Sequence, residues 1–502
     1  MTGNVQDPMN ICLVIPPSLF LIDERVFMSL GILKVAASLE QAGHCVEVLD
    51  LSGVSNFEEV AKIHADATKA QVFGVTATTP QMPAAIKIRS ALGDRRVILG
   101  GPHPTLVNAA LKGERRRGII GGRAAKAMKV LRKNFDVIVA GDGEKAIHTA
   151  LTARMGDVVD GDDPYGNLFL TNAELEANPL PARHLVDVES YRYTIDGVRA
   201  MSLIAQLGCP FGCGFCGGRE SSMLRRVRTR SSASVVAEVA HLHDTYGVTG
   251  YMLYDDELNV NPKMIELMDM LHAEQGERGV DFRFRGFIKS QLFSDEQAAS
   301  MARAGFKWIL VGFESGSSRI LENIEKRATV ADNSRCMAIA RRHGLKVKAL
   351  MSTGHPGESS VTIRETRDWL LAEQPDDFDV TIITTYPGTP YYDRAVETAP
   401  GVWTYTYPKS GDRLHAYELD YTQVADYYKG DPSGGYKAYT FTDHLSGGQL
   451  VVERDALERD VRAQLGIPYN AGHAAQRYEH SMGQLPSYIL RASNILEATR
   501  AG

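Results

Sequence analysis

Residues 200–216 read AMSLIAQLGCPFGCGFC, an apolar run followed at once by a loop with three cysteines. The apolar run has the length and composition of a buried β-strand. In the loop, Cys209, Cys213 and Cys216 lie four and then three residues apart, and the glycines between them let the backbone wrap closely around a ligand. Three thiolates at this spacing can hold three irons of one [4Fe–4S] cube, which leaves the fourth iron open.

The alternatives for this loop are a zinc site or three structural cysteines. A structural zinc normally takes four protein ligands, but no fourth cysteine is near, and the nearest histidines in the sequence are His184 and His241. A disulfide framework is excluded because half of the six cysteines lie in this one loop. Cys12 and Cys45 lie in apolar runs and are predicted to be core residues. The loop therefore favours an open iron–sulfur cluster.

The cysteine loop follows the first of six strand candidates that alternate with helical patterns between residues 199 and 395. The later candidates are GYMLYDDEL (250–258), DFRFRGFI (281–288), WILVGFES (308–315), KVKALMSTG (346–354) and FDVTIITTYPG (378–388). Six β/α units predict a partial (β/α)6 barrel, whose active site lies at the carboxyl ends of the strands. The cysteine loop is then expected at the mouth of that barrel.

Residues 9–150 show another alternating pattern, in which short apolar runs are separated by amphipathic helices. The runs are NICLVIPP (10–17), CVEVLDLSG (45–53), QVFGVTATT (71–79), RRVILGGPHP (95–104) and FDVIVAGDGE (135–144). This pattern is typical of a parallel sheet covered on both faces, so it predicts a doubly wound, Rossmann-like α/β domain. Ligands of such sheets bind beyond the carboxyl ends of the strands, which here carry small and glycine-rich stretches.

The rest of the chain divides into a connector and a C-terminal region. Residues 151–198 are rich in turn signals, so domains are expected at 1–150, 199–395 and 396–502, with the connector after the first. Ten of the 20 tyrosines lie between Tyr391 and Tyr439. They either line a substrate pocket or form a packed meander with exposed hydroxyl groups. The sequence predicts a small mixed C-terminal domain for substrate binding or capping.

Composition and charge exclude several classes of protein. The formal net charge is −6, which argues against a nucleic-acid-binding protein with a broad basic surface. No apolar run is long enough to span a bilayer. The first ten residues, MTGNVQDPMN, lack the charged and apolar regions of a signal peptide. We therefore expect a cytoplasmic protein without a membrane or nucleic-acid partner.

The cysteine loop and the strand ends that follow it resemble the radical SAM superfamily. The resemblance rests on Cys-x3-Cys-x2-Cys after the first barrel strand, with an aromatic residue before the third cysteine. It implies that S-adenosylmethionine (SAM) chelates the open iron, and that one electron cleaves it to methionine and a 5′-deoxyadenosyl radical. It also implies SAM contacts within the loop and in the motifs YDDELN, GFESGS and MSTGHPGES, at Phe215, Asp256, Glu257, Glu314, Ser315, Gly354 and Pro356.

The N-terminal pattern before such a barrel is similar to the cobalamin-binding domain of the cobalamin-dependent radical SAM family, which includes the class B methylases. The matching pieces are SLGILKVAASLE, TATTPQ, GGPHPT and AGDGEKAI. The resemblance implies cobalamin contacts at Ser29, Leu30, Gly31, Thr76, Thr78, Gln81, Gly101, Pro102, His103, Gly141, Gly143 and Glu144. The Asp-x-His-x-x-Gly motif that supplies a histidine to cobalt is absent, so cobalt is expected to lack a lower histidine. A domain that has lost its cofactor is the alternative.

The resemblance implies methyl transfer from methylcobalamin to an unactivated carbon of a small molecule, after the radical removes a hydrogen. It assigns no catalytic residue beyond the cluster cysteines, and it implies an external electron donor of the flavodoxin or ferredoxin type. A composition rich in Ala, Gly and Arg is typical of a high-GC bacterium, and for such a source we expect a natural-product pathway. The alternatives are a rearrangement, ring contraction or cyclisation without methyl transfer, phosphorus methylation, and an iron–sulfur electron carrier or sensor. A methylthio-type tRNA-modifying enzyme is disfavoured because extra N-terminal cysteines and a basic tail are absent.

Overall fold

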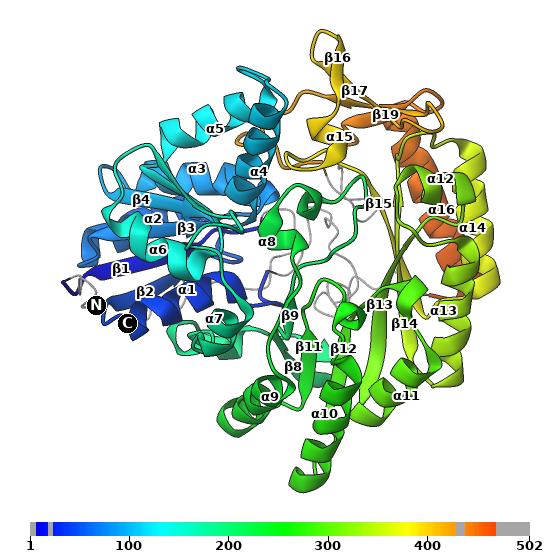
Figure 1. Cartoon of the computed structure of the whole chain (residues 1–502), viewed down its shortest axis with the longest axis horizontal. Helices are drawn as coiled ribbons and strands as arrows, with labels where there is room; N and C mark the ends of the chain where they lie inside the picture. Colours follow the sequence, from blue (N-terminus) through cyan, green and yellow to red (C-terminus); the bar gives the residue numbers. More distant parts are fainter. Residues whose placement is uncertain (1–6, 19–23, 428–436, 468–502) are drawn as a thin grey trace.

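The computed structural model describes residues 7–18, 24–427 and 437–467 of the chain. These residues form a parallel sheet with flanking helices, a curled half-barrel, and an antiparallel sheet that lies beside the end of the half-barrel (Figure 1). The α/β class and the three-part order predicted from the sequence are confirmed. Among the described helices, none combines the length and the apolar character needed to cross a bilayer.

The N-terminal sheet has six parallel strands in the order β2-β1-β3-β4-β5-β6. Its strands are β1 (Asn10–Ile15), β2 (Cys45–Asp50), β3 (Val72–Thr76), β4 (Arg96–Gly100), β5 (Val137–Gly141) and β6 (Asp157–Gly161). Its helices are α1 (Leu30–Gln41), α2 (Phe57–Ala67), α3 (Met82–Ala91), α4 (Pro102–Arg116), α5 (Arg123–Asn134) and α6 (Gly143–Thr152). Apolar side chains on both faces of the sheet are buried, as expected for strands between two layers of helices.

The last strand of this sheet, β6, lies in the stretch that the sequence analysis treats as a connector. Its pairing with β5 brings Gly161 so close to Gly141 that a Cβ on Gly141 would lie 2.2 Å from the Gly161 carbonyl carbon. Only two valines of β6 stand between acidic residues, so the strand lacks the long apolar run that marks the others. The connector continues with α7 (Asn172–Ala177) and β7 (Thr194–Ile195).

The second sheet follows the order β15-β14-β13-β12-β11-β8-β7, in which all strands except β7 run parallel. The parallel strands are β8 (Val198–Leu203), β11 (Gly250–Leu253), β12 (Arg283–Ile288), β13 (Phe306–Glu314), β14 (Lys346–Thr353) and β15 (Asp377–Ile382). The helices between them are α9 (Ser232–Tyr246), α10 (Met264–Arg278), α11 (Asp295–Ala304), α12 (Ser318–Asn323), α13 (Val330–Arg342) and α14 (Ser360–Glu373). The six predicted barrel strands are thus confirmed.

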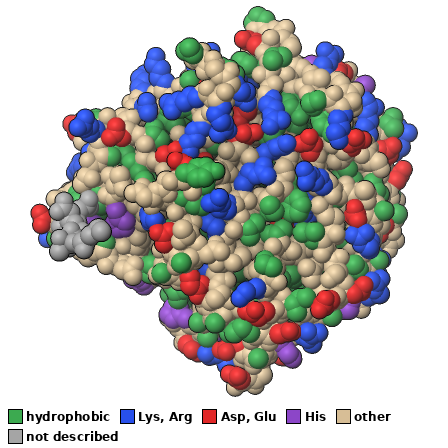
Figure 2. Space-filling view, in the orientation of Figure 1, with side chains coloured by type: hydrophobic (Ala, Val, Ile, Leu, Met, Phe, Trp, Pro, Cys, Tyr) green, Lys and Arg blue, Asp and Glu red, His purple; other side chains and the backbone are tan. Residues whose placement is uncertain are grey.

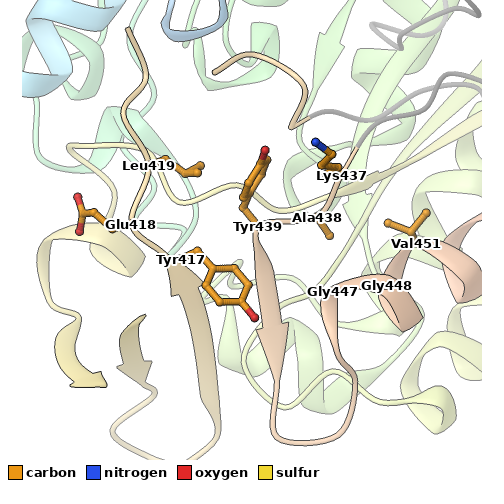
Figure 3. A pocket seen from close by; sticks show the side chains of 9 residues that line it. All are labelled: Tyr417, Glu418, Leu419, Lys437, Ala438, Tyr439, Gly447, Gly448 and Val451. Carbon is orange, nitrogen blue, oxygen red and sulfur yellow. The ribbon is translucent and has the colours of Figure 1, made fainter. Parts of the chain in front are cut away.

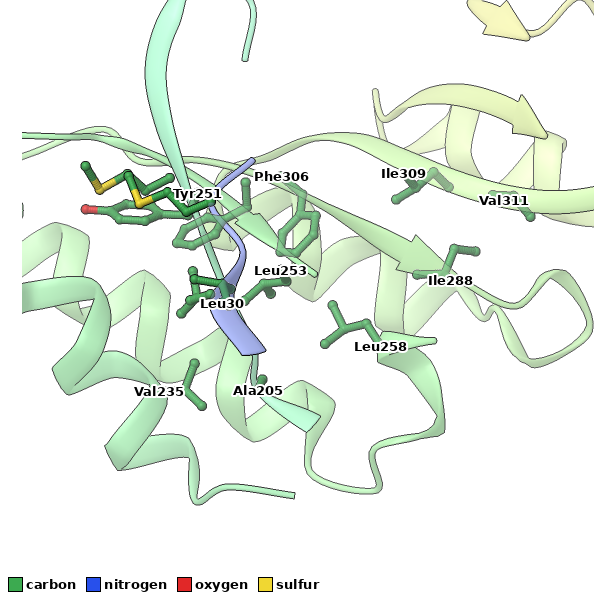
Figure 4. Packing of buried hydrophobic residues seen from close by; sticks show 14 of the residues in the cluster. Leu30, Ala205, Val235, Tyr251, Leu253, Leu258, Ile288, Phe306, Ile309 and Val311 are labelled. Atoms are coloured by element: carbon green, nitrogen blue, oxygen red, sulfur yellow. The ribbon is translucent and has the colours of Figure 1, made fainter. Parts of the chain in front are cut away.

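Short elements surround the cysteine loop at the mouth of the half-barrel. The strands β9 (Gln206–Leu207) and β10 (Arg228–Thr229) form a small antiparallel pair, and α8 (Ser222–Arg225) lies between them in the sequence. The two sheets share a core, because Leu30 of α1 belongs to the same buried cluster as Leu253 and Ile309 of the half-barrel (Figure 4). This shared packing fixes the N-terminal domain against the half-barrel.

The C-terminal region contains β16 (Val396–Ala399), β17 (Val402–Thr406), β18 (Arg413–Tyr417) and β19 (Thr440–Thr442), which form an antiparallel sheet after α15 (Pro390–Asp393). The final described helix, α16 (Gly447–Leu465), packs on α14 and β15. Arg462 of α16 donates to Asp377 of β15 at 3.1 Å, and Lys348 of β14 reaches the same carboxylate at 2.7 Å. The helix thereby covers the edge strand of the open half-barrel.

Candidate active site

The cysteine loop after β8 is held by backbone hydrogen bonds at both ends. The amide of Cys209 donates to Leu224 O at 2.9 Å, and the amide of Gly214 donates to Ile324 O at 2.8 Å. Gly214 has no room for a side chain, since a Cβ there would lie 2.6 Å from the ring of Tyr391. The loop conformation is therefore fixed by neighbours from α8, α12 and α15.

Two arginines hold the outer side of this loop through its carbonyl groups. Arg225 donates to Pro210 O at 2.9 Å. Arg219 donates to Gly212 O and to the carboxylate of Glu325. These bonds fix the positions of the Pro210 and Gly212 carbonyls within the loop.

The chemistry of the three thiols fits an open cluster. Burial raises the pKa of Cys209 to about 11 and that of Cys216 to about 12, although solvent still reaches Cys216. These two thiols stay protonated at neutral pH when they are free, whereas a bound metal removes the proton. The nearby histidine, His355, has both ring nitrogens within hydrogen-bond distance of protein hydroxyl groups. His355 is therefore engaged on both sides, and Cys209, Cys213 and Cys216 stay the predicted cluster ligands.

Carboxylates at the end of β11 lie beside the cysteine loop. Asp255 accepts from the amides of Ala205 and Gln206 at 2.8 and 3.1 Å, and burial raises its pKa to about 7. Asp256 accepts from the amide of Gly208 at 2.9 Å. One buried oxygen each of Asp255 and Glu257 has no hydrogen-bond partner in the described part of the chain. Such oxygens fit the ammonium group of a bound SAM.

Two buried lysines at this mouth have no motif that would have identified them in the sequence. Lys326, 4% exposed, donates to Glu314 at 3.0 Å. Lys289, 2% exposed, lies 4.1 Å from the centre of the Phe211 ring, and burial together with Lys326 lowers its pKa. Burial opposes ionisation of Glu314, but the charge of Lys326 and the hydrogen bonds from Ser352 and Lys326 together outweigh this effect, so the pKa of Glu314 falls. The pair keeps an ionised carboxylate inside the half-barrel.

A chain of hydrogen bonds runs from Glu314 to the cysteine loop. Ser352 donates to Glu314 Oε2 at 2.7 Å, so its oxygen accepts from His355 Nε2 at 2.8 Å. Burial lowers the pKa of His355 to about 4, and its unprotonated Nδ1 accepts from the Tyr391 hydroxyl at 3.3 Å. Each donor in this chain therefore points toward Glu314. At the other end, the ring of Tyr391 packs on Gly214. Glu314 itself has φ +66°, a strained conformation of the kind found at functional sites.

The structure places the other predicted SAM residues around this chain. Phe215 lies edge-on to His355, with ring centres 5.5 Å apart. Gly354 has φ +86° and lies under Leu450 of α16. Pro356 is buried and its carbonyl accepts from Asn323 at 2.8 Å. Ser315 is also buried, and its hydroxyl is within 3.0 Å of Thr366, so its observed bonds hold the turn after β13. Direct SAM contacts of these residues stay predictions.

Helices α1 after Ser29 and α6 after Asp142 begin at the carboxyl edge of the N-terminal sheet without a side-chain cap. Their first amide groups are therefore free of side-chain caps, and helix N-termini favour anions such as phosphate. Helix α4 offers no such group, because Pro102 and Pro104 have no amide hydrogen and the His103 amide donates to Ala77 O at 3.0 Å. This edge fits the phosphate-bearing tail of cobalamin.

The predicted cobalamin residues divide by exposure. Solvent reaches Ser29, Gly31, Thr76, Thr78, Gln81, Gly101, Pro102, Gly141 and Gly143, whereas Leu30, His103 and Glu144 are buried. His103 lies 3.0 Å from the Thr79 hydroxyl, and burial lowers its pKa to about 4. The Gln81 amide donates to Pro16 O at 3.0 Å and accepts from Thr78. The buried members support the edge, and their cobalamin contacts stay predictions.

The carboxyl edge of the N-terminal sheet faces the mouth of the half-barrel (Figure 1). Leu106 of α4 packs so tightly on the cysteine loop that a Cβ on Gly217 would lie 2.9 Å from it. A buried ion pair of 2.5 Å joins Asp142 to Arg228 of β10. A ligand bound on the sheet edge would therefore lie opposite the cysteine loop.

The C-terminal sheet carries a separate open pocket of about 480 Å³ (Figure 3). It is lined by Tyr417, Glu418, Leu419, Lys437, Ala438, Tyr439, Gly447, Gly448 and Val451. No predicted cofactor residue lines it. Tyr391, Tyr392, Tyr405, Tyr407, Tyr421 and Tyr427 are instead packed in buried clusters. Most described tyrosines of this region are thus packed, and two line a pocket.

Comparisons with known proteins agree with this architecture. Residues 203–370 match the family model of the radical SAM superfamily, and residues 24–131 match that of the B12 binding domain. An uncharacterized methyltransferase of Pyrococcus horikoshii is 28% identical over 402 residues, which cover 77% of this chain and 83% of the relative. An anaerobic magnesium-protoporphyrin IX monomethyl ester cyclase of Cereibacter sphaeroides is 26% identical over 276 residues, 51% of this chain and 44% of the cyclase.

Among solved structures, the radical SAM methyltransferase TsrM of Kitasatospora setae, with cobalamin and a [4Fe–4S] cluster bound, has a TM-score of 0.63. The alignment covers 99% of this chain and all of TsrM at 19% identity. This structural similarity establishes the fold alone. The two matched domains imply a [4Fe–4S] cluster, SAM and cobalamin as cofactors. With both domains present and facing each other, the chain belongs to the cobalamin-dependent radical SAM family.

Proposed function

We propose that this chain methylates an unactivated carbon of a small-molecule substrate, with a natural product as the substrate class. The observation that carries the proposal is the close packing of α4 on the cysteine loop, which sets the cobalamin edge opposite the barrel mouth. A substrate between the two edges would meet both the radical source and the methyl source, and this proximity is what such a transfer needs.

When bound, SAM with the cluster supplies a 5′-deoxyadenosyl radical, and cobalamin supplies a methyl group that leaves by homolysis. Cys209, Cys213 and Cys216 would hold three irons, and Arg219 and Arg225 fix the loop that carries these cysteines. The buried oxygens of Asp255 and Glu257, which have no partner among the described residues, would accept from the ammonium group of SAM. No side chain is required to move a proton in the transfer itself.

In this proposal the C-terminal region shields the reaction space from water. Its buried tyrosines Tyr421 and Tyr427 pack against Tyr386 at the end of β15, and Tyr421 also lies 6.3 Å from the ring of His103. Leu450 of helix α16 lies against Gly354, which follows β14. A dry enclosure protects a carbon radical from side reactions.

The names of relatives support methyl transfer as the outcome. The Pyrococcus horikoshii relative is named a methyltransferase and aligns with most of its own length. TsrM, whose fold this chain shares, is also named a methyltransferase. Both are proteins of other organisms, and their names inform the proposal for this chain by analogy of fold and sequence.

The test is anaerobic reconstitution with iron, sulfide, cobalamin and SAM that carries a labelled methyl group, followed by incubation with candidate substrates and reductant. We expect retained corrin absorption, 5′-deoxyadenosine, S-adenosylhomocysteine and a product that carries the label. Nuclear magnetic resonance of the product then places the methyl group on carbon or on phosphorus. Formation of 5′-deoxyadenosine and product without label or S-adenosylhomocysteine would contradict methylation.

The second candidate function is a cyclisation or rearrangement with the same cofactors. It is favoured by the Cereibacter sphaeroides relative, which is named a cyclase and aligns with 51% of this chain. In the same experiment this reaction gives a product of altered bonding with no added carbon, and it consumes SAM without forming S-adenosylhomocysteine.

A further inference from the structure

We propose that Cys12, Glu47 and His64 form a Zn²⁺ site inside the N-terminal domain. The side chains come from β1, β2 and α2, which lie together in Figure 1, and their ligand atoms all lie within 4.8 Å of one another. Cys12 and Glu47 belong to the amino-terminal halves of their strands, whereas the predicted cobalamin residues lie at the carboxyl edge of the sheet. The site is therefore separate from the reaction proposed above, and the inference does not depend on that reaction.

Regular secondary structure brings the three side chains together. Cys12 and Glu47 are partners in the parallel pairing of β1 with β2, so both side chains lie on the same face of the sheet. Helix α2 packs on this face, where Ala61 and Ala65 belong to the same buried cluster as Cys12. His64 follows Ala61 by three residues and therefore lies on the same side of the helix. The sheet and the helix, rather than a loop, define the site.

The distances between the ligand atoms match those of a tetrahedral zinc site. Cys12 Sγ lies 3.6 Å from His64 Nε2, and this nitrogen lies 3.2 Å from Glu47 Oε1. Bond lengths of about 2.3 Å to sulfur and about 2.0–2.1 Å to nitrogen and oxygen place tetrahedral ligands about 3.5 Å and about 3.3 Å apart, respectively. Thiolate, imidazole and carboxylate are also the ligand types that Zn²⁺ takes in proteins. The ion therefore fits among these three atoms with small shifts of the side chains.

Neighbouring groups hold the ligands and leave one side open to water. Thr68 donates its hydroxyl hydrogen to the Glu47 carboxylate, and its amide donates to His64 O at 2.9 Å. The side chains of His64 and Glu47 are 29% and 43% exposed, so water can complete the coordination of the ion. On binding, the Cys12 thiol releases its proton to solvent and the sulfur binds the metal, and no oxidant or reductant takes part.

A nucleophilic triad is the other chemistry that a cysteine, a histidine and a glutamate suggest, and the geometry disfavours it. In a triad the nucleophile and the acid contact different nitrogens of the histidine ring. Here Cys12 and Glu47 both contact Nε2 of His64. Cys12 is also 0% exposed, so a substrate does not reach its sulfur. A hydrogen-bonded network without metal is the remaining alternative, and the experiment below includes it as an outcome.

The test is Zn²⁺ binding by the full chain, prepared with cluster and cobalamin so that the cysteine loop is occupied. Histidines are scattered over the face shown in Figure 2, and His184 pairs with Glu40 at 3.0 Å, so added Zn²⁺ also meets other histidines. X-ray absorption at the zinc edge distinguishes these sites by the number of sulfur atoms bound to zinc. Equilibrium dialysis with zinc analysis gives the affinity.

Two variants and two matched controls accompany the wild type. Cys12→Ala removes the thiol, and Glu47→Gln removes the carboxylate at a partly exposed position, so it tests the site even if Cys12→Ala does not fold. Cys336→Ala removes another fully buried thiol, on α13. Glu40→Gln changes a histidine–glutamate pair outside the cluster.

We expect the wild type to bind a Zn²⁺ ion with a single sulfur neighbour. Both variants should bind it at least about 100-fold more weakly, since loss of a group that only supports a ligand already costs about 10- to 100-fold. Zn²⁺ should raise the melting temperature of the wild type and the controls but not that of the variants.

Three results would overturn the inference. Zinc without a sulfur neighbour would lie on other histidines, and zinc with three sulfur neighbours would lie in the cysteine loop. Equal affinity of the wild type and Glu47→Gln, or no binding at all, would mean that the three side chains form a hydrogen-bonded network only.

Discussion

The barrel mouth and the edge of the N-terminal sheet face each other but are built from opposite kinds of residues. The mouth contains buried charges, among them Asp255, Lys289, Glu314 and Lys326. The solvent-accessible part of the sheet edge is neutral, with glycines, threonines and the uncapped starts of α1 and α6. The difference shows how one chain serves two cofactors. Buried charges orient a small zwitterion such as SAM, whereas small side chains and backbone amides accommodate a large corrin with a phosphate tail.

The largest expected effect is loss of the cluster at the barrel mouth while the edge of the N-terminal sheet still binds cobalamin. In Cys213→Ala the loop has two thiols left, so we expect loss of the cluster and of all 5′-deoxyadenosine formation, while cobalamin binding at the sheet edge persists. Iron analysis and corrin absorption of the purified variant check this. Cys45→Ala, which removes an exposed cysteine on β2, serves as the control and should keep its iron. Loss of cobalamin together with the cluster would show that the two sites are not independent.

Breaking a buried charge pair tests the mouth next. In Lys326→Met the ionised Glu314 loses its partner in a buried site, so we expect a loss of stability of about 3–5 kcal/mol and weaker SAM binding. Thermal denaturation and SAM titration under anaerobic conditions measure both. The double variant K326M/E314Q removes both charges and should recover part of the stability. If the double variant is less stable than the single one, the pair does not act as described.

The pH dependence of stability reports another buried carboxyl at the mouth. Burial raises the pKa of Glu358 to about 7, so the folded chain binds a proton there that the unfolded chain releases above its lower pKa. This contribution to stability is complete below the unfolded pKa and is lost as the pH rises through 7. We expect Glu358→Gln, which cannot ionise, to lose less stability than the wild type between pH 5 and pH 8, by about 3 kcal/mol. Melting temperatures across this range test it, with exposed Glu322→Gln as a control of unchanged slope.

The sheet edge is tested by two glycines with similar backbone angles. Gly141 (φ +88°) would place a Cβ against Gly161, whereas Gly156 (φ +83°) has open space. Both alanine variants carry the strain of a positive φ, about 1 kcal/mol, but only Gly141→Ala must also move β6. We expect Gly141→Ala to lower cobalamin affinity and the melting temperature more than Gly156→Ala does. Equal effects of the two variants would show that the close approach of β5 and β6 does not shape the edge.

The smallest expected effect concerns the hydrogen-bond chain to the cysteine loop. Tyr391→Phe keeps the ring that packs on Gly214 but removes the hydroxyl that donates to His355, a loss of about 1 kcal/mol. We expect normal cluster content, and a changed electron paramagnetic resonance spectrum of the reduced cluster with SAM bound. An unchanged spectrum would mean that the chain has no influence on the cluster site.

The success of sequence reasoning also differs between these two regions. The cysteine loop is predictable because its three ligands lie within eight residues and their chemistry is specific. The roles of Lys289 and Lys326 at the site were not predictable, because they depend on burial beside residues that are far away in the sequence. The same applies to His355, which the fold places between Ser352 and Tyr391. Strand β6 was not predicted, because two valines between acidic residues form neither an apolar run nor an alternation long enough to indicate a strand.

The central claim is that the cluster and cobalamin lie face to face in one reaction space. Electron paramagnetic resonance of the fully loaded protein, with the cluster reduced and the cobalt as cob(II)alamin, tests it most directly. We expect spectra that are broadened and split by interaction between the two spins, and a simple cob(II)alamin spectrum in Cys213→Ala. A wild-type spectrum equal to the sum of two isolated centres would contradict the account.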